Sequence, residues 1–347
     1  MPQNLPSTFG LRRPFRLAAQ ALVMVFVIGL LLWYVGIEPV LSVISKVKLE
    51  YLALAFLSYL CLNLLFTFRL LRVFKREGLK TSFAKTLMAQ YAGMLTSDVT
   101  PGKSGYILMP FYLMDQGVPT SLSLSAVLGI QSVEFLVKVL GGAVALFFLI
   151  ENAVYPLSTA VLLATSIGIC LMLAGGILFA AMSWSERVIK LFNRVANSRF
   201  LSRFTGRLAS KVEEYRDSSR KTQKAFPEIV IITFACWIIK GFEWYFLGLA
   251  LGITKISWFG FFLMHPLVTA LGFVPLTPSG AGFQEGATVG VFWLLGVDQP
   301  TAFAFALLSR VLLLIEDFAG LPRIVQSASK LFPRKRQTAT RDSPAGT

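Results

Sequence analysis

Val274-Pro-Leu-Thr-Pro-Ser-Gly-Ala-Gly-Phe-Gln-Glu285 interrupts two strongly apolar runs of the sequence. Earlier in the chain, Thr100-Pro-Gly-Lys-Ser-Gly105 carries the same pattern, Thr-Pro-x-x-small-Gly. Each Pro removes a backbone donor, and each Gly permits backbone conformations that a continuous helix does not use. Both segments are therefore predicted to break a helix.

The composition is that of a membrane protein. Of the 347 residues, 55% are hydrophobic and only 15% are charged, and the apolar runs are long enough to cross a bilayer. Broken helices are tolerated in a membrane only where their backbone is buried in protein or lines a wet cavity. Paired breaks in corresponding halves of a chain indicate a transport site. We therefore predict an all-α integral membrane protein.

The apolar runs predict six full spans and two re-entrant hairpins broken by Pro and Gly. The full spans are expected at about 17–37, 51–68, 121–150, 157–182, 228–252 and 300–325. The hairpins are expected at 84–117 and 256–297, where the apolar character is interrupted. One polytopic domain then covers 17–326.

The basic residues predict how this domain is divided and oriented. The chain carries 33 Lys and Arg against 18 Asp and Glu, a net charge of +15. Basic loops mark the cytoplasmic face of a membrane protein, so the charge indicates orientation and not a nucleic-acid partner. Four segments are predicted to be cytoplasmic, namely the N-terminus at 1–16, the turn at 69–85, the loop at 183–226 and a disordered tail at 327–347.

This orientation places both termini in the cytoplasm. The expected location is the plasma membrane. The halves 17–182 and 227–326 then form an inverted repeat, because the two hairpins must enter from opposite faces. The apolar spacing in 183–226 suits amphipathic helices on the anionic cytoplasmic leaflet. A solvated loop explains the same segment equally well.

The breaks also supply candidate residues for binding an anion. A half-helix that starts inside the membrane presents unpaired N–H groups and a positive dipole end. The second break includes Pro278 and Gly280, and the half-helices are predicted to start at Gly105 and Gly282. Lys103 adds a cation and Arg310 offers a bidentate fork to phosphate. A phosphate-bearing headgroup is thus the expected substrate.

Several charged residues admit structural as well as functional roles. Glu285 suits a charge-balancing role at the site, but it could equally cap its own half-helix or pair with Arg310. Glu134 and Lys138 are expected to neutralise one another on one helix face. Yet the number of residues between Pro101 and Glu134 is nearly the same as that between Pro278 and Arg310, so Glu134 occupies an equivalent place in the first half. Glu134 and its neighbour Lys138 are therefore substrate-binding candidates as well.

Other polar residues are expected to be structural, and no catalytic or metal site is expected. Lys240 and Glu243 form a predicted neutralising pair, and His265 is predicted to pack against its neighbours in preference to acting as a proton relay. Cys61, Cys170 and Cys236 match neither a disulfide framework nor a metal site. We see no nucleophile with a base partner and no nucleotide loop. The chain is therefore expected to need no cofactor and not to be an enzyme.

The chain resembles the flippase-like transmembrane domain shared with bacterial lysylphosphatidylglycerol synthases. The resemblance rests on the motif that ends at Glu285, on Leu308-Ser-Arg310 and on Pro101-Gly-Lys-Ser-Gly105. It covers about 17–325 and implies a domain that moves aminoacylated phospholipid, other anionic lipid or polyprenyl-phosphate-linked material. The soluble domain that transfers the amino acid in the synthases has no counterpart here, so lipid lysylation is not implied.

The expected function is therefore lipid transport between leaflets by alternating access. A small-solute secondary transporter would use the same inverted repeat. A membrane scaffold for a lipid- or glycan-modifying enzyme would instead depend on the loop at 183–226. The membrane lipid and the anionic leaflet are the expected partners, and a lipid-modifying enzyme or a second copy of the chain are further partners that the residues leave open.

Overall fold

The computed structural model describes residues 26, 29–100, 104–185, 187, 208–271 and 280–331, and all elements in these segments are helical. Four helices in this part of the chain are long and apolar enough to cross a membrane. They are α3 (Leu49–Arg76), α6 (Thr120–Asn152), α7 (Thr159–Trp184) and α11 (Phe226–Ala250). These helices confirm the prediction of an all-α membrane protein. Most of the predicted span at 17–37 lies outside the described residues.

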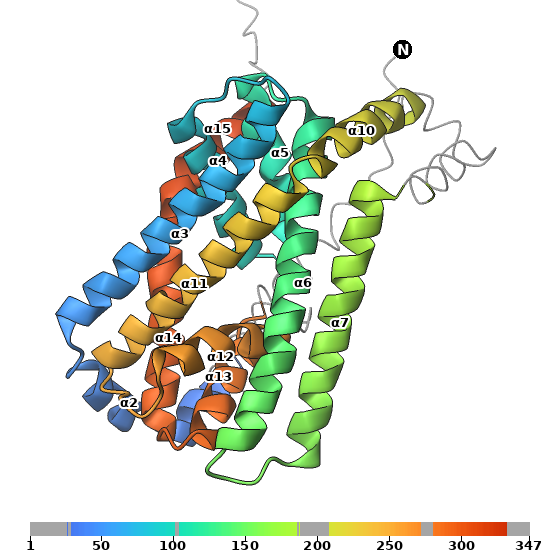
Figure 1. Ribbon diagram of the computed structural model, residues 1–347. Coiled ribbons are helices and arrows are strands. Elements are labelled where there is room, and N and C mark those ends of the chain that lie inside the picture. The colour runs from blue at the N-terminus through green and yellow to red at the C-terminus, as the bar shows by residue number, and fades with distance from the viewer. Residues whose placement is uncertain are drawn as a thin grey trace, which may run out of the picture.

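The long helices form a bundle in which chain neighbours and distant segments lie side by side. Helix α11 packs against α3, and α6 packs antiparallel to α7 (Figure 1). Helix α14 (Gln299–Asp317) contacts the short helix α2 (Ile37–Ile44) as well as α11. The two halves of the chain are therefore interleaved in one bundle.

Each of the two sequence breaks separates a pair of helices that pack together. The first pair is α4 (Phe83–Asp98) with the short η2 (Ser104–Leu108), α5 (Met109–Leu113) and η3 (Met114–Gln116). The second pair is α12 (Trp258–Leu271) with α13 (Phe283–Leu294). The two broken hairpins lie at opposite ends of the bundle, α4 and α5 at the top and α12 and α13 at the bottom (Figure 1).

The start of α13 shows why its break needs glycine. Gly280 and Gly282 have φ angles of 70° and 86°, a region that residues with a Cβ rarely adopt. Gly282 is the N-cap residue, and its N–H donates to Glu285 Oε2 at 2.5 Å. Glu285 thus caps its own half-helix. Capping is one of the two structural roles predicted for this residue.

The structure corrects the predicted end of the second span. Helix α3 continues past Phe68 to Arg76, so the first basic residues of the predicted cytoplasmic turn belong to the helix. Arg69 is buried, while Arg72 and Arg76 both bind Glu228 at the start of α11. No Pro or Gly interrupts the sequence between 69 and 77, and the positive φ of Gly78 follows the helix end. The apolar run is therefore shorter than the helix that contains it.

The predicted last span is divided in two. Helix α14 ends at Asp317, the turn η4 (Phe318–Gly320) follows, and α15 (Leu321–Leu331) continues past the predicted boundary at 326. The Arg323 guanidinium of α15 is bound by the Asp115 carboxylate and by the carbonyl oxygen of Tyr112. These contacts attach α15 to the first broken hairpin.

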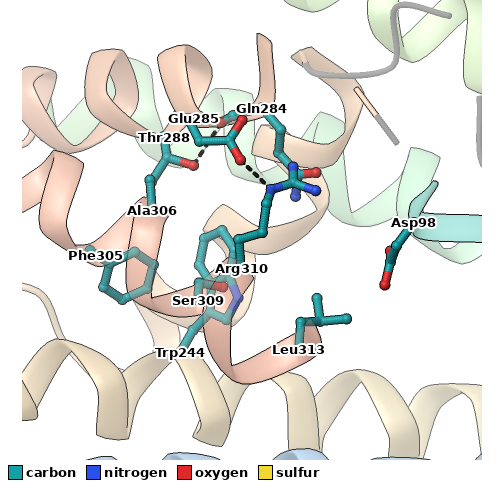
Figure 2. Close-up of a pocket in the computed structure, with 10 residues that line it drawn as sticks. All are labelled: Asp98, Trp244, Gln284, Glu285, Thr288, Phe305, Ala306, Ser309, Arg310 and Leu313. Carbon is teal, nitrogen blue, oxygen red and sulfur yellow. Dashed lines mark hydrogen bonds and ion pairs between the residues drawn. The ribbon is translucent and has the colours of Figure 1, made fainter. Parts of the chain in front are cut away.

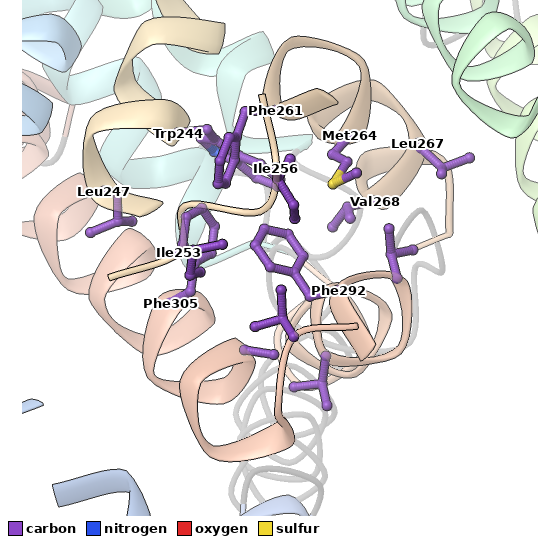
Figure 3. Close-up of a cluster of buried hydrophobic side chains, with 14 of the residues drawn as sticks. Trp244, Leu247, Ile253, Ile256, Phe261, Met264, Leu267, Val268, Phe292 and Phe305 are labelled. Carbon is purple, nitrogen blue, oxygen red and sulfur yellow. The ribbon is translucent and has the colours of Figure 1, made fainter. Parts of the chain in front are cut away.

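Aromatic side chains hold the second hairpin against α11 and α14 (Figure 3). The ring centroids of Phe292 and Phe305 are 4.7 Å apart, and those of Trp244 and Phe305 are 5.2 Å apart. Phe261 packs on both phenylalanines and is fully buried. Such rings bury large apolar areas and interlock, so this cluster fixes the position of α13 and its capped N-terminus.

Helix α10 (Leu208–Gln223) is the longest described part of the predicted amphipathic loop at 183–226. It packs against the first turns of α6 through polar groups, with Ser125 Oγ 3.0 Å from Thr222 Oγ1. Ser121 Oγ donates to Glu214 Oε1 at 2.7 Å. This part of the loop thus docks on protein, and the apolar positions predicted between 188 and 204 lie outside the described residues.

Replacing Gly320 by Ala is expected to destabilise the fold by about 1–3 kcal/mol, the usual cost of overpacking. A Cβ at Gly320 would lie 2.2 Å from the backbone nitrogen of Ala92, so η4 would have to move away from α4. The matched control is Gly290→Ala in α13, where a Cβ meets nothing within 4 Å. Thermal unfolding in detergent should lower the midpoint for the first variant only. Equal midpoints would show that η4 and α4 do not pack this closely.

Candidate functional site

A cavity of about 300 Å³ lies between the helices of the two halves. Its lining comes from α3, α4, η2, α6, α7, α11, α12, α13 and α14 and includes Gly280 at the second break. Most of the lining is apolar, but charged and amide side chains enter it from several helices. These polar residues are Gln90, Asp98, Gln131, Glu134, Lys138, Lys240 and Gln284. A concave, mostly apolar site with a few converging polar groups is the usual form of a ligand pocket.

A smaller pocket of about 30 Å³ adjoins the cavity and contains Glu285 and Arg310 (Figure 2). The two share lining residues, namely Asp98, Trp244, Gln284, Ser309 and Leu313. The capped start of α13 and the middle of α14 supply its polar groups. The two spaces thus form one continuous site.

Glu285 and Arg310 are bound to each other in this pocket. Arg310 Nε donates to Glu285 Oε1, while Glu285 Oε2 accepts the N–H of Gly282. The Glu285 side chain is almost completely buried, but 21% of the Arg310 side chain is exposed. Within the described residues only Nε of Arg310 donates a hydrogen bond, so its two terminal nitrogens remain able to bind an anion.

A second ion cluster lies on the cavity wall at Glu134. Arg69 Nη2 donates to Glu134 Oε1 at 2.5 Å, and Arg69 Nη1 donates to Thr233 Oγ1 at 2.7 Å. The Lys138 ammonium lies 3.7 Å from Glu134 Oε2. Arg69 is 1% exposed. Glu134 therefore joins one fully buried cation to another that reaches the cavity.

Sequence reasoning missed Arg69 as part of the site. The apolar run ends at Phe68, so the sequence places Arg69 in the predicted cytoplasmic turn with the basic residues that follow it. The signal that could have found it is the position of the helix end, because the next helix-ending glycine is Gly78. A helix extended to that glycine would have placed Arg69 inside the membrane.

The two other predicted structural groups behave as expected. Lys240 Nζ lies 2.6 and 2.7 Å from the two carboxylate oxygens of Glu243, which confirms the neutralising pair. The same ammonium lies 5.1 Å from the centre of the Tyr59 ring. His265 packs edge-on against Trp244 at 5.1 Å, as predicted for a packing histidine, and also lines the cavity.

The candidate residues fall into three groups. Glu134, Lys138 and Gly280 line the large cavity, and Glu285 and Arg310 line the smaller pocket. Two candidates line neither space. The N–H of Gly105 donates to Thr100 Oγ1 at 2.6 Å, and that of Gly282 is bound by Glu285, so both amides are used within the protein. Lys103 and Pro278 lie outside the described residues.

The fold and the site define a multi-pass α-helical membrane protein with a largely apolar cavity, entered by a few charged side chains, between two broken hairpins. Residues 17–317 match the family described as the lysylphosphatidylglycerol synthase TM region. The chain belongs to this family, as its two motifs indicated.

The chain is also similar to archaeal members of a group named UPF0104 membrane proteins. One from Pyrococcus horikoshii is 19% identical over 82% of this chain and 88% of its own length. Another from Methanothermobacter thermautotrophicus is 19% identical over 83% of this chain and 86% of its own length. A relative from Methanocaldococcus jannaschii is 36% identical over 88 residues, which are 25% of this chain and 36% of the relative.

Proposed function

We infer that the chain moves an anionic, aminoacylated or polyprenyl-phosphate-linked lipid between the membrane leaflets. The observation that carries this proposal is the cavity between the two halves, which adjoins the pocket of Arg310. A guanidinium in a partly buried site binds phosphate more strongly than it would in bulk solvent. The apolar lining suits the part of the lipid next to its headgroup.

The proposed mechanism is alternating access around this cavity. Six full spans and two hairpins that enter from opposite faces would form an inverted repeat, and the position of the hairpins at opposite ends of the bundle supports this arrangement (Figure 1). Movement of one half against the other would open the cavity to each leaflet in turn. The bound headgroup would thereby cross the membrane without exposure to the hydrocarbon core.

The charged residues receive specific roles in this proposal. Arg310, with Lys103, would hold the phosphate near the predicted half-helix starts at Gly105 and Gly282. Glu134 and Glu285 would balance the cationic charge in the empty site or contact a cationic substituent on the headgroup. Lys138 would add a second cation at the cavity wall, 3.7 Å from Glu134.

The proposed location is the plasma membrane, with both termini in the cytoplasm and the basic loop at the anionic leaflet. The described helix α10 carries part of that loop, and its Glu214 and Asp217 are exposed. An associated lipid-modifying enzyme or a second copy of the chain is compatible with this arrangement. The assignment is to transport and not to catalysis.

Leaflet exchange of labelled lipids in vesicles containing purified protein tests the proposal. Anionic, aminoacylated and polyprenyl-phosphate lipids are compared, and faster exchange of one class than in protein-free vesicles is the expected result. The same vesicles should leave every headgroup chemically intact, whereas headgroup turnover would indicate an enzyme. No exchange of any class by folded protein would overturn the proposal.

A small-solute carrier is the second candidate, because a cavity of about 300 Å³ is large enough for a headgroup or for a free solute of the same size. Uptake of labelled glycerol phosphate or of amino acids into the same vesicles separates the two. Solute uptake without lipid exchange would favour the carrier.

A further inference from the structure

The C-terminal end of α14 carries two buried carboxyl groups that the proposed lipid site does not use. Asp317 is 0% exposed and Glu316 is 6% exposed. The Tyr59 hydroxyl of α3 lies 3.0 and 3.2 Å from the two oxygens of Asp317 and donates to this carboxyl group. Asp98 of α4, which lines both spaces of the site, faces the same carboxyl group.

Asp98 and Asp317 are two acids that face one another, an arrangement that favours a proton on one of them. An ionised carboxylate can only accept hydrogen bonds, so two carboxyl groups bond to each other only when one of them is protonated. Tyr59 supplies a single hydroxyl hydrogen and cannot serve both acids. The full burial of Asp317 beside a second acid therefore favours a pair that holds at least one proton.

Glu316 shows that this end of α14 contains a further acid without a donor. Neither of its oxygens accepts a hydrogen bond from any group in the described chain. Asn63 faces the Glu316 carboxyl, but its amide nitrogen donates to the Tyr59 carbonyl oxygen at 3.3 Å. An ionised carboxylate is costly in such a place unless a proton or another cation neutralises it.

The charged groups around these acids are already engaged. On α11, Lys240 is held at 2.6 Å by Glu243, which also faces Glu316. Tyr91 of α4 faces Glu316 and Asp317 and supplies no positive charge. Arg310 of α14 is bound by Glu285, and Arg323 of α15 is bound by Asp115. Each of these three described cations thus has its own carboxylate.

We propose that Asp98, Asp317 and Glu316 form a proton-binding site that couples proton movement to lipid transport, an inference that rests on the proposed function. A proton from the cavity would bind an oxygen of Asp98 and pass to Asp317. In that step the O–H bond of Asp98 breaks and an O–H bond of Asp317 forms, with no change in oxidation state.

The position of Asp98 explains the coupling. It lies on the wall of the pocket across from Arg310 (Figure 2). A negative charge on Asp98 would repel an anionic headgroup bound at Arg310, and a proton on the acid pair weakens this repulsion. Proton and headgroup binding should therefore favour one another, and the coupling is reciprocal because it is thermodynamic. The expected transport is symport of the lipid with a proton.

The steady-state distribution of labelled lipid across vesicles under a pH gradient tests this proposal. One proton per lipid and one pH unit should accumulate the lipid up to about tenfold in the leaflet toward which protons flow. Asp317→Asn should abolish accumulation, and Glu316→Gln should reduce it. The matched control is Asp298→Asn at the exposed start of the same helix, where Asn also caps well.

Infrared spectroscopy of the purified protein supplies a readout that does not depend on transport. The carboxylic C=O band of a protonated acid should be present in the wild type and in Asp298→Asn, and should be reduced in Asp317→Asn. An unchanged band in Asp317→Asn would overturn the proton site, whether or not the protein moves lipid.

The transport outcomes separate the two proposals. Rapid wild-type exchange with equal leaflet distributions under the gradient would overturn the coupling and leave the proposed function standing. Accumulation driven by a sodium gradient in place of the pH gradient would also overturn it. No exchange at all in the wild type would overturn the proposed function and the coupling with it.

Discussion

Replacing Glu134 by Leu should destabilise the folded protein by about 3–5 kcal/mol, the cost of leaving a buried charge without its partner. Arg69 is 1% exposed, and Glu134 is its one carboxylate partner among the described residues. The remaining contact to Thr233 at 2.7 Å is to a neutral hydroxyl and cannot neutralise the guanidinium. Chemical unfolding in detergent would measure the change.

The double variant Arg69→Met with Glu134→Leu separates a lost ion pair from lost packing. Replacing both members of a buried pair by apolar residues is often close to neutral. Most of the lost stability should therefore return in the double variant. Glu228→Gln is the control, since Glu228 pairs with two partly exposed arginines and should cost about 1 kcal/mol or less. A double variant as unstable as Glu134→Leu would contradict the ion-pair explanation.

Arg69 also marks the limit of what could be predicted from the sequence. The membrane class and the two breaks follow from local signals, because apolar length, Pro and Gly act within a few residues. The partner of Arg69 lies 65 residues further along the sequence, on another helix. The pairing could therefore not be inferred from residue spacing along one helix. The sequence did mark Glu134 as a candidate, but only its local neighbour Lys138 could be assigned to it.

The same distinction holds at the second break. The sequence allows a capping role, a pairing role and a functional role for Glu285. The structure shows that one carboxylate oxygen caps the half-helix while the other pairs with Arg310. The capping contact spans three residues and is local. The pairing contact depends on how α13 packs against α14, which the buried aromatic cluster determines. The acids Asp98, Glu316 and Asp317 could not be predicted to form one site, because they come from two helices that are far apart in the sequence.

Arg310→Ala is expected to lower the rate of lipid exchange at least about 30-fold, which corresponds to about 2 kcal/mol of lost binding to the phosphate. The guanidinium keeps two nitrogens available beyond its contact to Glu285, and Ala offers none. The matched control is Arg76→Ala, an exposed arginine that pairs with Glu228 away from the cavity. Leaflet exchange of anionic lipid in vesicles measures both variants, after circular dichroism has shown that they fold.

Glu285→Gln then separates the two roles of the pair. Gln can still accept the N–H of Gly282 and so preserves the cap, but it removes the negative charge beside Arg310. If Glu285 contacts a cationic substituent, exchange of aminoacylated lipid should fall while exchange of purely anionic lipid is retained. If Glu285 only positions Arg310, both lipids should slow together. Unchanged exchange in Arg310→Ala would contradict the phosphate site itself, because no other described cation lines the smaller pocket.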